Sequence, residues 1–229
     1  SSTLAYDATR PVVAVFGANI VELFRSFDFV TVYPEVTSLQ TGVRKASMDY
    51  IGPAEEYGYS PDVCGYVKND VGLMLKDRQS PFGRVPKPDL LVCNYSGCNT
   101  FIKWFEALAH FYGAEFFLVD LPYVREDGIS DGDVSYVVAQ LRELIARCEE
   151  RTGTPFSEPK LRQILDLSRQ AEDLWVQILH LAKERPSPFD SYFEAVFYMA
   201  PINMLRGTPE CVDYNRRVLE EMKARRDEK

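Results

Sequence analysis

The sequence contains no run of 18 apolar residues and no Cys-x-x-Cys pair, and it has only two histidines among 229 residues. The first absence excludes a transmembrane helix. The scarcity of histidine argues against a zinc site, since His110 is predicted at a helix C-terminus and His180 inside a long helix. The five cysteines are odd in number and the chain is too long for a stapled mini-domain, so no disulfide framework is expected.

Several motifs of common enzymes are also missing. There is no Gly-x-Gly-x-x-Gly after a strand, no Gly-Lys-Ser/Thr phosphate loop and no Gly-x-Ser-x-Gly turn, so dinucleotide binding, NTP hydrolysis and hydrolase chemistry lack their usual sequence support. The first residues show no basic stretch leading into an apolar one, which favours a reducing, cytoplasmic location. A formal net charge of -8 disfavours nucleic acid as a partner.

The composition is that of an ordinary globular protein, with 46% hydrophobic, 13% aromatic and 26% charged residues. A compact body of this mass buries roughly 72% of its extended-chain surface, so a hydrophobic core can form without covalent cross-links. The length fits one large domain or two small ones.

Short apolar runs alternate with helical patterns in the first half of the chain, which predicts a parallel sheet covered by helices. The fold class is therefore α/β, with a four-stranded, flavodoxin-like or Rossmann-like sheet followed by a helical region. The predicted strands are residues 12–16, 29–33, 90–93 and 116–119.

Helical patterns surround these strands and continue after them. Two helices are predicted in the long segment between the second and third strands, at residues 39–50 and 63–75. The remaining predicted helices are residues 20–27, 99–111, 134–148, 159–185, 192–205 and 210–226. A change of composition near Asp127-Gly128 predicts two domains, an α/β domain over residues 1–127 and a helical region over residues 128–229.

The carboxyl ends of parallel strands meet at one edge of a sheet, where ligands bind. The loops predicted at this edge are residues 17–19 (Gly-Ala-Asn), 33–35 (Tyr-Pro-Glu), 93–100 and 120–123 (Asp-Leu-Pro-Tyr). A Pro-Glu pair after a strand has two interpretations: Glu35 is an acid or base at this edge, or a carboxylate that caps the next helix. Asp120 and Tyr123 have the same two interpretations.

Two cysteines stand at predicted helix starts. Cys98 precedes the helix that begins near Asn99, and Cys64 begins another helical stretch. A helix N-terminus favours the thiolate form of cysteine, and thiolates bind soft metals and iron–sulfur clusters. The alternative is that both are small buried hydrophobic residues. Cys93, at the end of an apolar strand, and Cys148 and Cys211, within helical patterns, are expected in the core.

Two stretches resemble one known family. Residues 59–72 (YSPDVCGYVKNDVG) and 98–109 (CNTFIKWFEALA) are similar to the benzoyl-CoA reductase and 2-hydroxyacyl-CoA dehydratase family, as are residues 33–35 and 119–123. Within the family, Lys103-Trp104-Phe105-Glu106 is closer to the ring-reducing B and C subunits than to the dehydratases.

The resemblance implies a [4Fe-4S] cluster ligated by three cysteines, beside a bound acyl-CoA thioester. Cys64 and Cys98 fall on two of the ligand positions. In the family the third ligand comes from a second α/β domain after the helical region, so this chain resembles about half of a family subunit. Either that domain supplies the third thiolate, which we favour, or one of the other cysteines does. We expect the isolated chain to bind no stable cluster and to be inactive alone.

The function implied by the resemblance is that of an iron–sulfur subunit of an ATP-driven benzoyl-CoA reductase. It would pair with a related subunit, receive low-potential electrons from an ATP-hydrolysing iron–sulfur activator, and pass them singly to an aromatic acyl-CoA. Glu35 would position substrate or deliver a proton. One alternative is a 2-hydroxyacyl-CoA dehydratase subunit, and another is a non-catalytic α/β scaffold subunit without metal.

Overall fold

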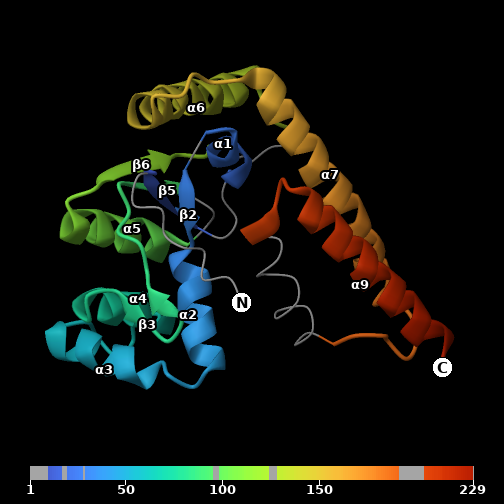
Figure 1. The fold of residues 1–229 in the computed structure, drawn as a ribbon, viewed down its shortest axis with the longest axis horizontal. Coiled ribbons are helices and arrows are strands. Elements are labelled where there is room, and N and C mark those ends of the chain that lie inside the picture. Colours follow the sequence, from blue (N-terminus) through green and yellow to red (C-terminus); the bar gives the residue numbers. More distant parts are fainter. Residues whose placement is uncertain are drawn as a thin grey trace. The chain divides into compact units, whose positions relative to one another are not determined.

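A computed structural model describes residues 10–16, 20–27, 29–94, 98–123, 128–190 and 204–228 (Figure 1). The described residues form a parallel sheet of four strands in the order β2-β1-β5-β6, which confirms the predicted α/β class. The strands are β1 (Val12–Val15), β2 (Val30–Val32), β5 (Leu90–Asn94) and β6 (Glu115–Val119), each close to its predicted range.

The two central strands have continuous apolar runs because both faces of the sheet are covered. Residues 12–15 of β1 and 90–93 of β5 are at most 1% exposed. Such continuous apolar runs are typical of parallel strands between helical layers. In register, Ala14 of β1 lies opposite Val32 of β2 on one side and Leu91 of β5 on the other.

Helices α1 (Val21–Ser26) and α5 (Asn99–Tyr112) follow β1 and β5. Helix α5 ends at Gly113, whose left-handed φ of 59° suits glycine. Its predicted apolar face is largely buried: Trp104, Phe105 and Leu108 lie in the core, while Phe111 is 36% exposed. Helix α6 (Asp131–Thr152) starts with a capping box between Ser130 and Asp133.

The segment between β2 and β5 contains three helices where two were predicted. They are α2 (Pro34–Val43), α3 (Met48–Tyr57) and α4 (Gly65–Leu75), followed by a short antiparallel pair, β3 (Gln79–Ser80) and β4 (Gly83–Arg84). The single helix predicted over residues 39–50 is wrong. The chain leaves the helix at Arg44, and Lys45 adopts a left-handed φ of 58°, which breaks the ladder of helical hydrogen bonds.

Helices α3 and α4 approach closely at one glycine. A Cβ atom on Gly72 would lie 1.9 Å from the Tyr50 carbonyl oxygen, so only glycine fits there without a shift of backbone. Tyr50 also donates a hydrogen bond from its hydroxyl to the Gln79 carbonyl, 3.0 Å away. The inserted helices therefore form a tightly packed group.

Contacts divide the chain into two compact units, Ser1–Asn19 with Phe27–Pro155, and Ile20–Ser26 with Phe156–Lys229. The second unit pairs α7 (Glu158–Leu181) with α9 (Pro209–Asp227) around Trp175, Ile178 and Met222. Most of the helix predicted over residues 192–205 lies outside the described residues. The domain boundary predicted near residues 127 and 128 adjoins another such segment and stays a prediction.

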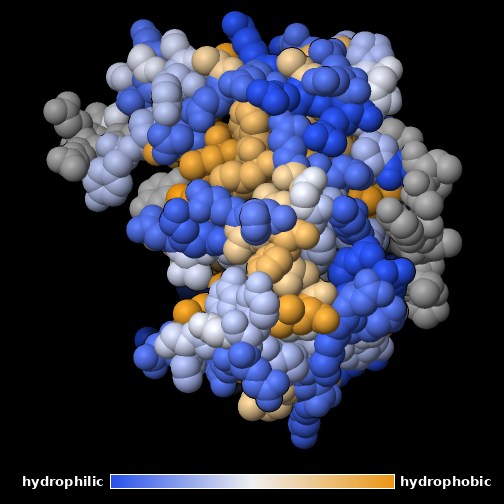
Figure 2. All heavy atoms as spheres, turned by 90° about the vertical axis from the view of Figure 1, so that its left-hand side faces the viewer, coloured by the Kyte–Doolittle hydropathy of each residue, from blue (hydrophilic) through white to orange (hydrophobic). Residues whose placement is uncertain are grey.

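On the face turned to the viewer in Figure 2, apolar side chains form a band that runs down the middle, interrupted and flanked by hydrophilic ones. The exposed aromatic residues include Tyr57 on α3 and Phe111 on α5, whose ring centroids are 5.7 Å apart. Among the described residues, no helix has the length and apolar character needed to cross a membrane.

Candidate functional site

Cys64 and Cys98 occupy the same position in two different helices. Each is the N-cap residue, Cys64 of α4 and Cys98 of α5, as the sequence predicted. Both side chains are exposed and neither forms a disulfide. The carbonyl of each cysteine accepts a backbone hydrogen bond from its helix, at 3.2 Å from Lys68 and 3.1 Å from Phe101. The two thiols are therefore accessible and lie where the helix dipole favours negative charge.

Helices α4 and α5 are packed together in one core cluster and joined by a buried hydrogen bond. Val67 and Val71 of α4 belong to the same cluster as Leu108 of α5. The indole nitrogen Nε1 of Trp104 donates to Oδ2 of Asp70 at 2.9 Å, and both residues are at least 94% buried. This bond fixes the two cysteine-bearing helices to each other.

Tyr112, at the end of α5, is also a neighbour of residues in and after α4. Arg78 follows the end of α4, and Tyr112 is the last residue of α5. Burial and then the Asp70 charge raise the pKa of Tyr112, whereas the nearby Arg78 lowers it. Tyr112 is thus a neighbour of Asp70 and Arg78, and Asp70 contacts Trp104 at a point six residues after the cysteine that starts each helix.

A buried lysine holds the segment that leads into Cys64. Lys68 is only 5% exposed. Its Nζ lies 2.6 Å from Oε1 of Glu55 on α3 and donates to the Pro61 carbonyl at 2.7 Å. The lysine thereby ties α3, α4 and the turn before Cys64 together.

Glu35 lies in the first turn of α2 and is half-buried. It is a neighbour of Tyr66 in α4, whose pKa is raised by burial and then by the charges of Glu35 and Cys64. The structure thus brings a carboxylate, a phenol and a thiol together beside the start of α4. A role for Glu35 as acid, base or substrate-positioning group stays a prediction.

The other three cysteines are in the core, as predicted. Burial raises the pKa of Cys93 to about 11 and that of Cys148 to about 12, and it also raises the pKa of Cys211. A thiol in such surroundings resists ionisation and makes a poor metal ligand. Within the described ranges, no group of three His, Cys, Asp or Glu side chains could hold a metal ion.

The remaining residues of the predicted edge have other partners or lie outside the described part of the chain. Asp120 accepts a hydrogen bond from the Tyr136 hydroxyl at 2.8 Å, and its backbone amide donates to Gln140, so it anchors α6. Tyr123 is 81% exposed. Residues 17–19 and 95–97 are not among the described residues.

Sequence reasoning missed Lys68, Asn69 and Asp70, three buried polar residues in a row in α4. The sequence pattern of α4 does indicate their burial, because a helix with apolar residues on both sides has no fully solvated face for charges. Asp70 is buried, and loss of hydration raises its pKa to about 7, an effect that the Trp104 hydrogen bond opposes.

The amino-acid sequence is similar to one protein family and to several enzyme subunits. A family model described as 2-hydroxyglutaryl-CoA dehydratase, D-component, matches residues 20–229. The B subunit of benzoyl-CoA reductase from Thauera aromatica is 41% identical over 212 residues, which are 91% of this chain and 49% of that protein.

Two dehydratase subunits are also similar. The (R)-phenyllactyl-CoA dehydratase alpha subunit of Clostridium sporogenes is 33% identical over 193 residues, covering 84% of this chain and 47% of that protein. The (R)-2-hydroxyisocaproyl-CoA dehydratase alpha subunit of Clostridioides difficile is 30% identical over 222 residues, which are 95% of this chain and 53% of that protein. The chain therefore spans about half the length of the curated relatives it matches.

Proposed function

This chain belongs to the 2-hydroxyglutaryl-CoA dehydratase D-component family, and we propose that it is the part of an enzyme subunit in which Cys64 and Cys98 hold a [4Fe-4S] cluster beside an acyl-CoA thioester. The family resemblance noted from residues 59–72 and 98–109 is thereby confirmed. The observation that carries the proposal is the pair of exposed thiols at the N-caps of two helices that are joined by the Asp70–Trp104 hydrogen bond.

The donors present fit such a cluster in kind. Cys64 and Cys98 are free, exposed thiols, and two helix starts offset the negative charge that cluster thiolates carry. Cys93, Cys148 and Cys211 do not fit, because each is buried and its pKa is raised. The proposal therefore takes the third thiolate from beyond this chain, in the half of the relatives' length that the chain does not span.

When bound, the cluster would supply single low-potential electrons to the thioester. The residues of this chain create the surroundings for that transfer. Phe101, Trp104 and Phe105 form an aromatic layer on α5, the helix that Cys98 caps, with ring centroids 5.9 and 6.0 Å apart between successive members. Such a layer excludes water, and poor solvation favours a low reduction potential.

Glu35 and Tyr66 are the polar groups beside Cys64 in the proposed site. A carboxylate can orient a substrate or hold a proton for transfer, and the neighbouring phenol can donate a hydrogen bond to it or to the substrate. We assign Glu35 the proton-holding role, because it is the ionisable group of this pair with an acidic ordinary pKa.

The proposed partners are a paralogous subunit and an ATP-hydrolysing iron–sulfur activator. The relatives are named as subunits, which supports an assembly of more than one chain. The apolar band in Figure 2 gives such a partner a surface to cover. Tyr57 and Phe111, which are 55% and 36% exposed, are candidates for that contact.

Two reactions remain within the family. The 41% identity to a subunit of benzoyl-CoA reductase favours reduction of an aromatic acyl-CoA, and the 33% and 30% identities to dehydratase subunits support dehydration of a 2-hydroxyacyl-CoA as the second candidate. A substrate panel on the complete, activator-coupled complex tests the choice. We expect benzoyl-CoA to be reduced. Turnover of 2-hydroxyacyl-CoA without reduction of benzoyl-CoA would select the second candidate.

The same complex tests the role of the thiols. Cys64→Ala and Cys98→Ala are each expected to abolish turnover of both substrate types, whereas Cys148→Ala, which changes a buried thiol, retains it. Full activity of either exposed-cysteine variant would contradict the proposal. A complex that binds acyl-CoA but lacks iron and sulfide would indicate a metal-free scaffold instead.

A further inference from the structure

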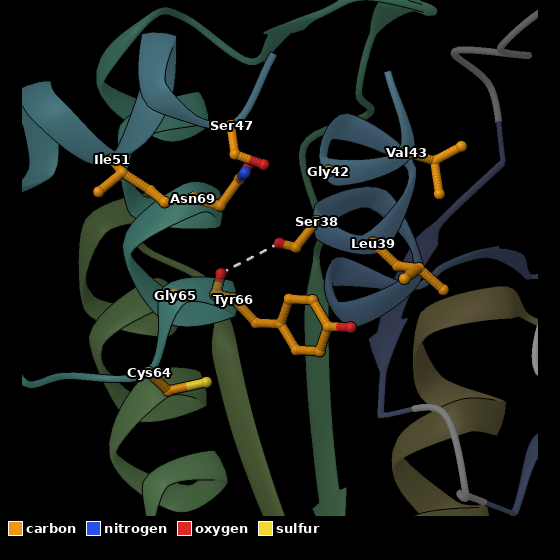
Figure 3. A pocket seen from close by; sticks show the side chains of 10 residues that line it. All are labelled: Ser38, Leu39, Gly42, Val43, Ser47, Ile51, Cys64, Gly65, Tyr66 and Asn69. Carbon is orange, nitrogen blue, oxygen red and sulfur yellow. Dashed lines mark hydrogen bonds between the residues drawn. The ribbon is translucent and has the colours of Figure 1, made fainter. Parts of the chain in front are cut away.

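A pocket of about 380 Å³ opens between α2 on one side and α3 with α4 on the other. Figure 3 shows Cys64 at one end of the pocket and Ser47 with Asn69 at the opposite end. Leu39, Val43 and Ile51 supply apolar walls. The pocket thus leads from the proposed cluster ligand on α4 into a mainly apolar space.

The two sides of the pocket are fixed relative to each other. The Ser38 hydroxyl on α2 donates to the Tyr66 carbonyl on α4 at 3.0 Å (Figure 3). At the far end, the amide nitrogen of Asn69 is directed toward the Ser47 hydroxyl. Asn69 is 2% exposed, and its Oδ1 has no hydrogen-bond partner among the described groups. A fixed cavity with a polar end orients a ligand better than a flexible surface does.

The face of α2 that lines the pocket begins at the proposed site. Residues three, four and seven positions apart share a helix face, so Glu35, Ser38 and Gly42 lie along one side of α2. Glu35 and Cys64 are both neighbours of Tyr66, and Cys64 lines the same pocket as Ser38 and Gly42, so this face of α2 extends from the proposed site into the pocket.

Gly42 keeps part of the wall open. A Cβ atom added there would contact only the Ser47 Oγ, at 3.5 Å, and Gly42 is itself exposed. Any larger side chain at this position therefore extends into the pocket without displacing backbone. Glycine weakens a helix, and the backbone conformation at Gly42 does not require it. What Gly42 contributes is the space in the pocket that a side chain would otherwise occupy.

We propose that this pocket receives the acyl group of the thioester substrate and that Gly42 sets the size of acyl group that fits. The inference rests on the proposed function, because the thioester is placed by Cys64. An apolar cavity of about 150 Å³ is enough to bind benzene. A pocket of about 380 Å³ therefore accommodates a benzoyl group, and a two-carbon acyl group leaves most of it empty.

Binding of acetyl-CoA, benzoyl-CoA and 2-naphthoyl-CoA to the full-length subunit in its complex tests the inference. Gly42→Leu is expected to raise the Kd of benzoyl-CoA at least tenfold and to leave the Kd of acetyl-CoA within twofold. Ile51→Ala enlarges the opposite wall and is expected to lower the Kd of 2-naphthoyl-CoA at least threefold. The matched control is Gly52→Leu on α3, because a Cβ atom there meets nothing within 4 Å and Gly52 does not line the pocket.

The outcomes separate the two proposals. If wild-type complex binds none of the three thioesters, the proposed function fails and this inference fails with it. If wild-type binds benzoyl-CoA and both Gly42→Leu and Ile51→Ala bind all three ligands as wild-type does, the proposed function stands and the pocket is not the acyl site. Should Gly42→Leu fail to fold, Ile51→Ala alone decides, and an unchanged Kd of 2-naphthoyl-CoA overturns the inference.

Discussion

Asp70 and Trp104 stand at equivalent positions in their helices, each six residues after the cysteine that caps the helix, and they are hydrogen-bonded to each other at 2.9 Å. Six residues of α-helix rise about 9 Å. The bond therefore joins α4 and α5 at equal distances from Cys64 and Cys98. In our proposal, the equal distance of the two cysteines from this bond lets both thiols bind one cluster.

Removing the donor of this bond should loosen the thiol pair. Trp104→Phe leaves the buried Asp70 acceptor without a partner and should lower the free energy of unfolding by about 2 kcal/mol or more. It should also lower the iron content of the full-length protein. Trp175→Phe, which changes a buried tryptophan of the other compact unit, controls for lost volume and should leave iron unchanged. Equal iron losses in both variants would contradict the role of the bond.

The Asp70 carboxyl should make stability depend on pH. Burial raises its pKa from 3.8 to about 7 in the folded protein, so the folded state binds the proton more tightly than the unfolded state. Its contribution is complete below about pH 4 and is lost as the pH rises through about 7, by at most about 4 kcal/mol. Asp70→Asn should remove this component when urea unfolding is measured from pH 4 to pH 8. The same pH dependence in wild-type and Asp70→Asn would refute it.

The close approach of α3 and α4 should make one glycine intolerant of change. Gly72→Ala places a methyl group 1.9 Å from the Tyr50 carbonyl oxygen, so the helices must separate, at a cost of about 3 kcal/mol or more. Gly52→Ala, in the same helix group, meets no atom within 4 Å and should be neutral or slightly stabilising. Thermal unfolding of both variants measures the difference, and similar melting temperatures would be inconsistent with this packing.

The buried Lys68, which pairs with Glu55, should contribute more to stability than the exposed Lys103, which pairs with Glu106. Lys68→Met removes the contacts to Glu55 and to the Pro61 carbonyl and should cost about 1–3 kcal/mol, since the lysine side chain is 6% exposed but Glu55 is 35% exposed. Lys103→Met breaks a pair with Glu106 whose side chains are 80% and 43% exposed, and should cost less than about 0.5 kcal/mol. Equal losses in the free energy of unfolding of the two variants, measured with urea, would be evidence against a stabilising role for the Lys68 contacts.

The layered fold could be predicted because its signals are local. Continuous apolar runs such as residues 12–15 and 90–93 identify buried parallel strands, and each lies where expected. The helix break near Lys45 was missed because residues 39–50 have no proline, and the left-handed turn depends on how α2 and α3 pack. The antiparallel pair β3 and β4 was missed because each strand has only two residues.

The candidate site was predictable in part for the same reason. Helix starts at Cys64 and Cys98 follow from local sequence, and both are confirmed. The hydrogen bond between Asp70 and Trp104 joins residues 34 positions apart, and no local pattern specifies such a partner. The apolar residues on both sides of α4 indicate that some of its charges are buried, but the partners of Lys68 and Asp70 follow from the packing of α3, α4 and α5.

The donors of the described chain also predict its behaviour in isolation. Within the described ranges, Cys64 and Cys98 are the exposed cysteines, and no group of three His, Cys, Asp or Glu side chains could hold a metal ion. Iron–sulfur reconstitution of the 229-residue chain alone should therefore give less than one cluster per chain. A stoichiometric cluster would show that a cysteine now buried, such as Cys93, becomes the third ligand.

Iron and acid-labile sulfide in the anaerobically purified full-length protein test the central claim most directly. The account predicts one [4Fe-4S] cluster per subunit in wild-type and in Cys148→Ala, whose thiol is buried, and a loss of most iron and sulfide in Cys64→Ala and in Cys98→Ala. Wild-type levels of iron and sulfide in either exposed-cysteine variant would contradict it.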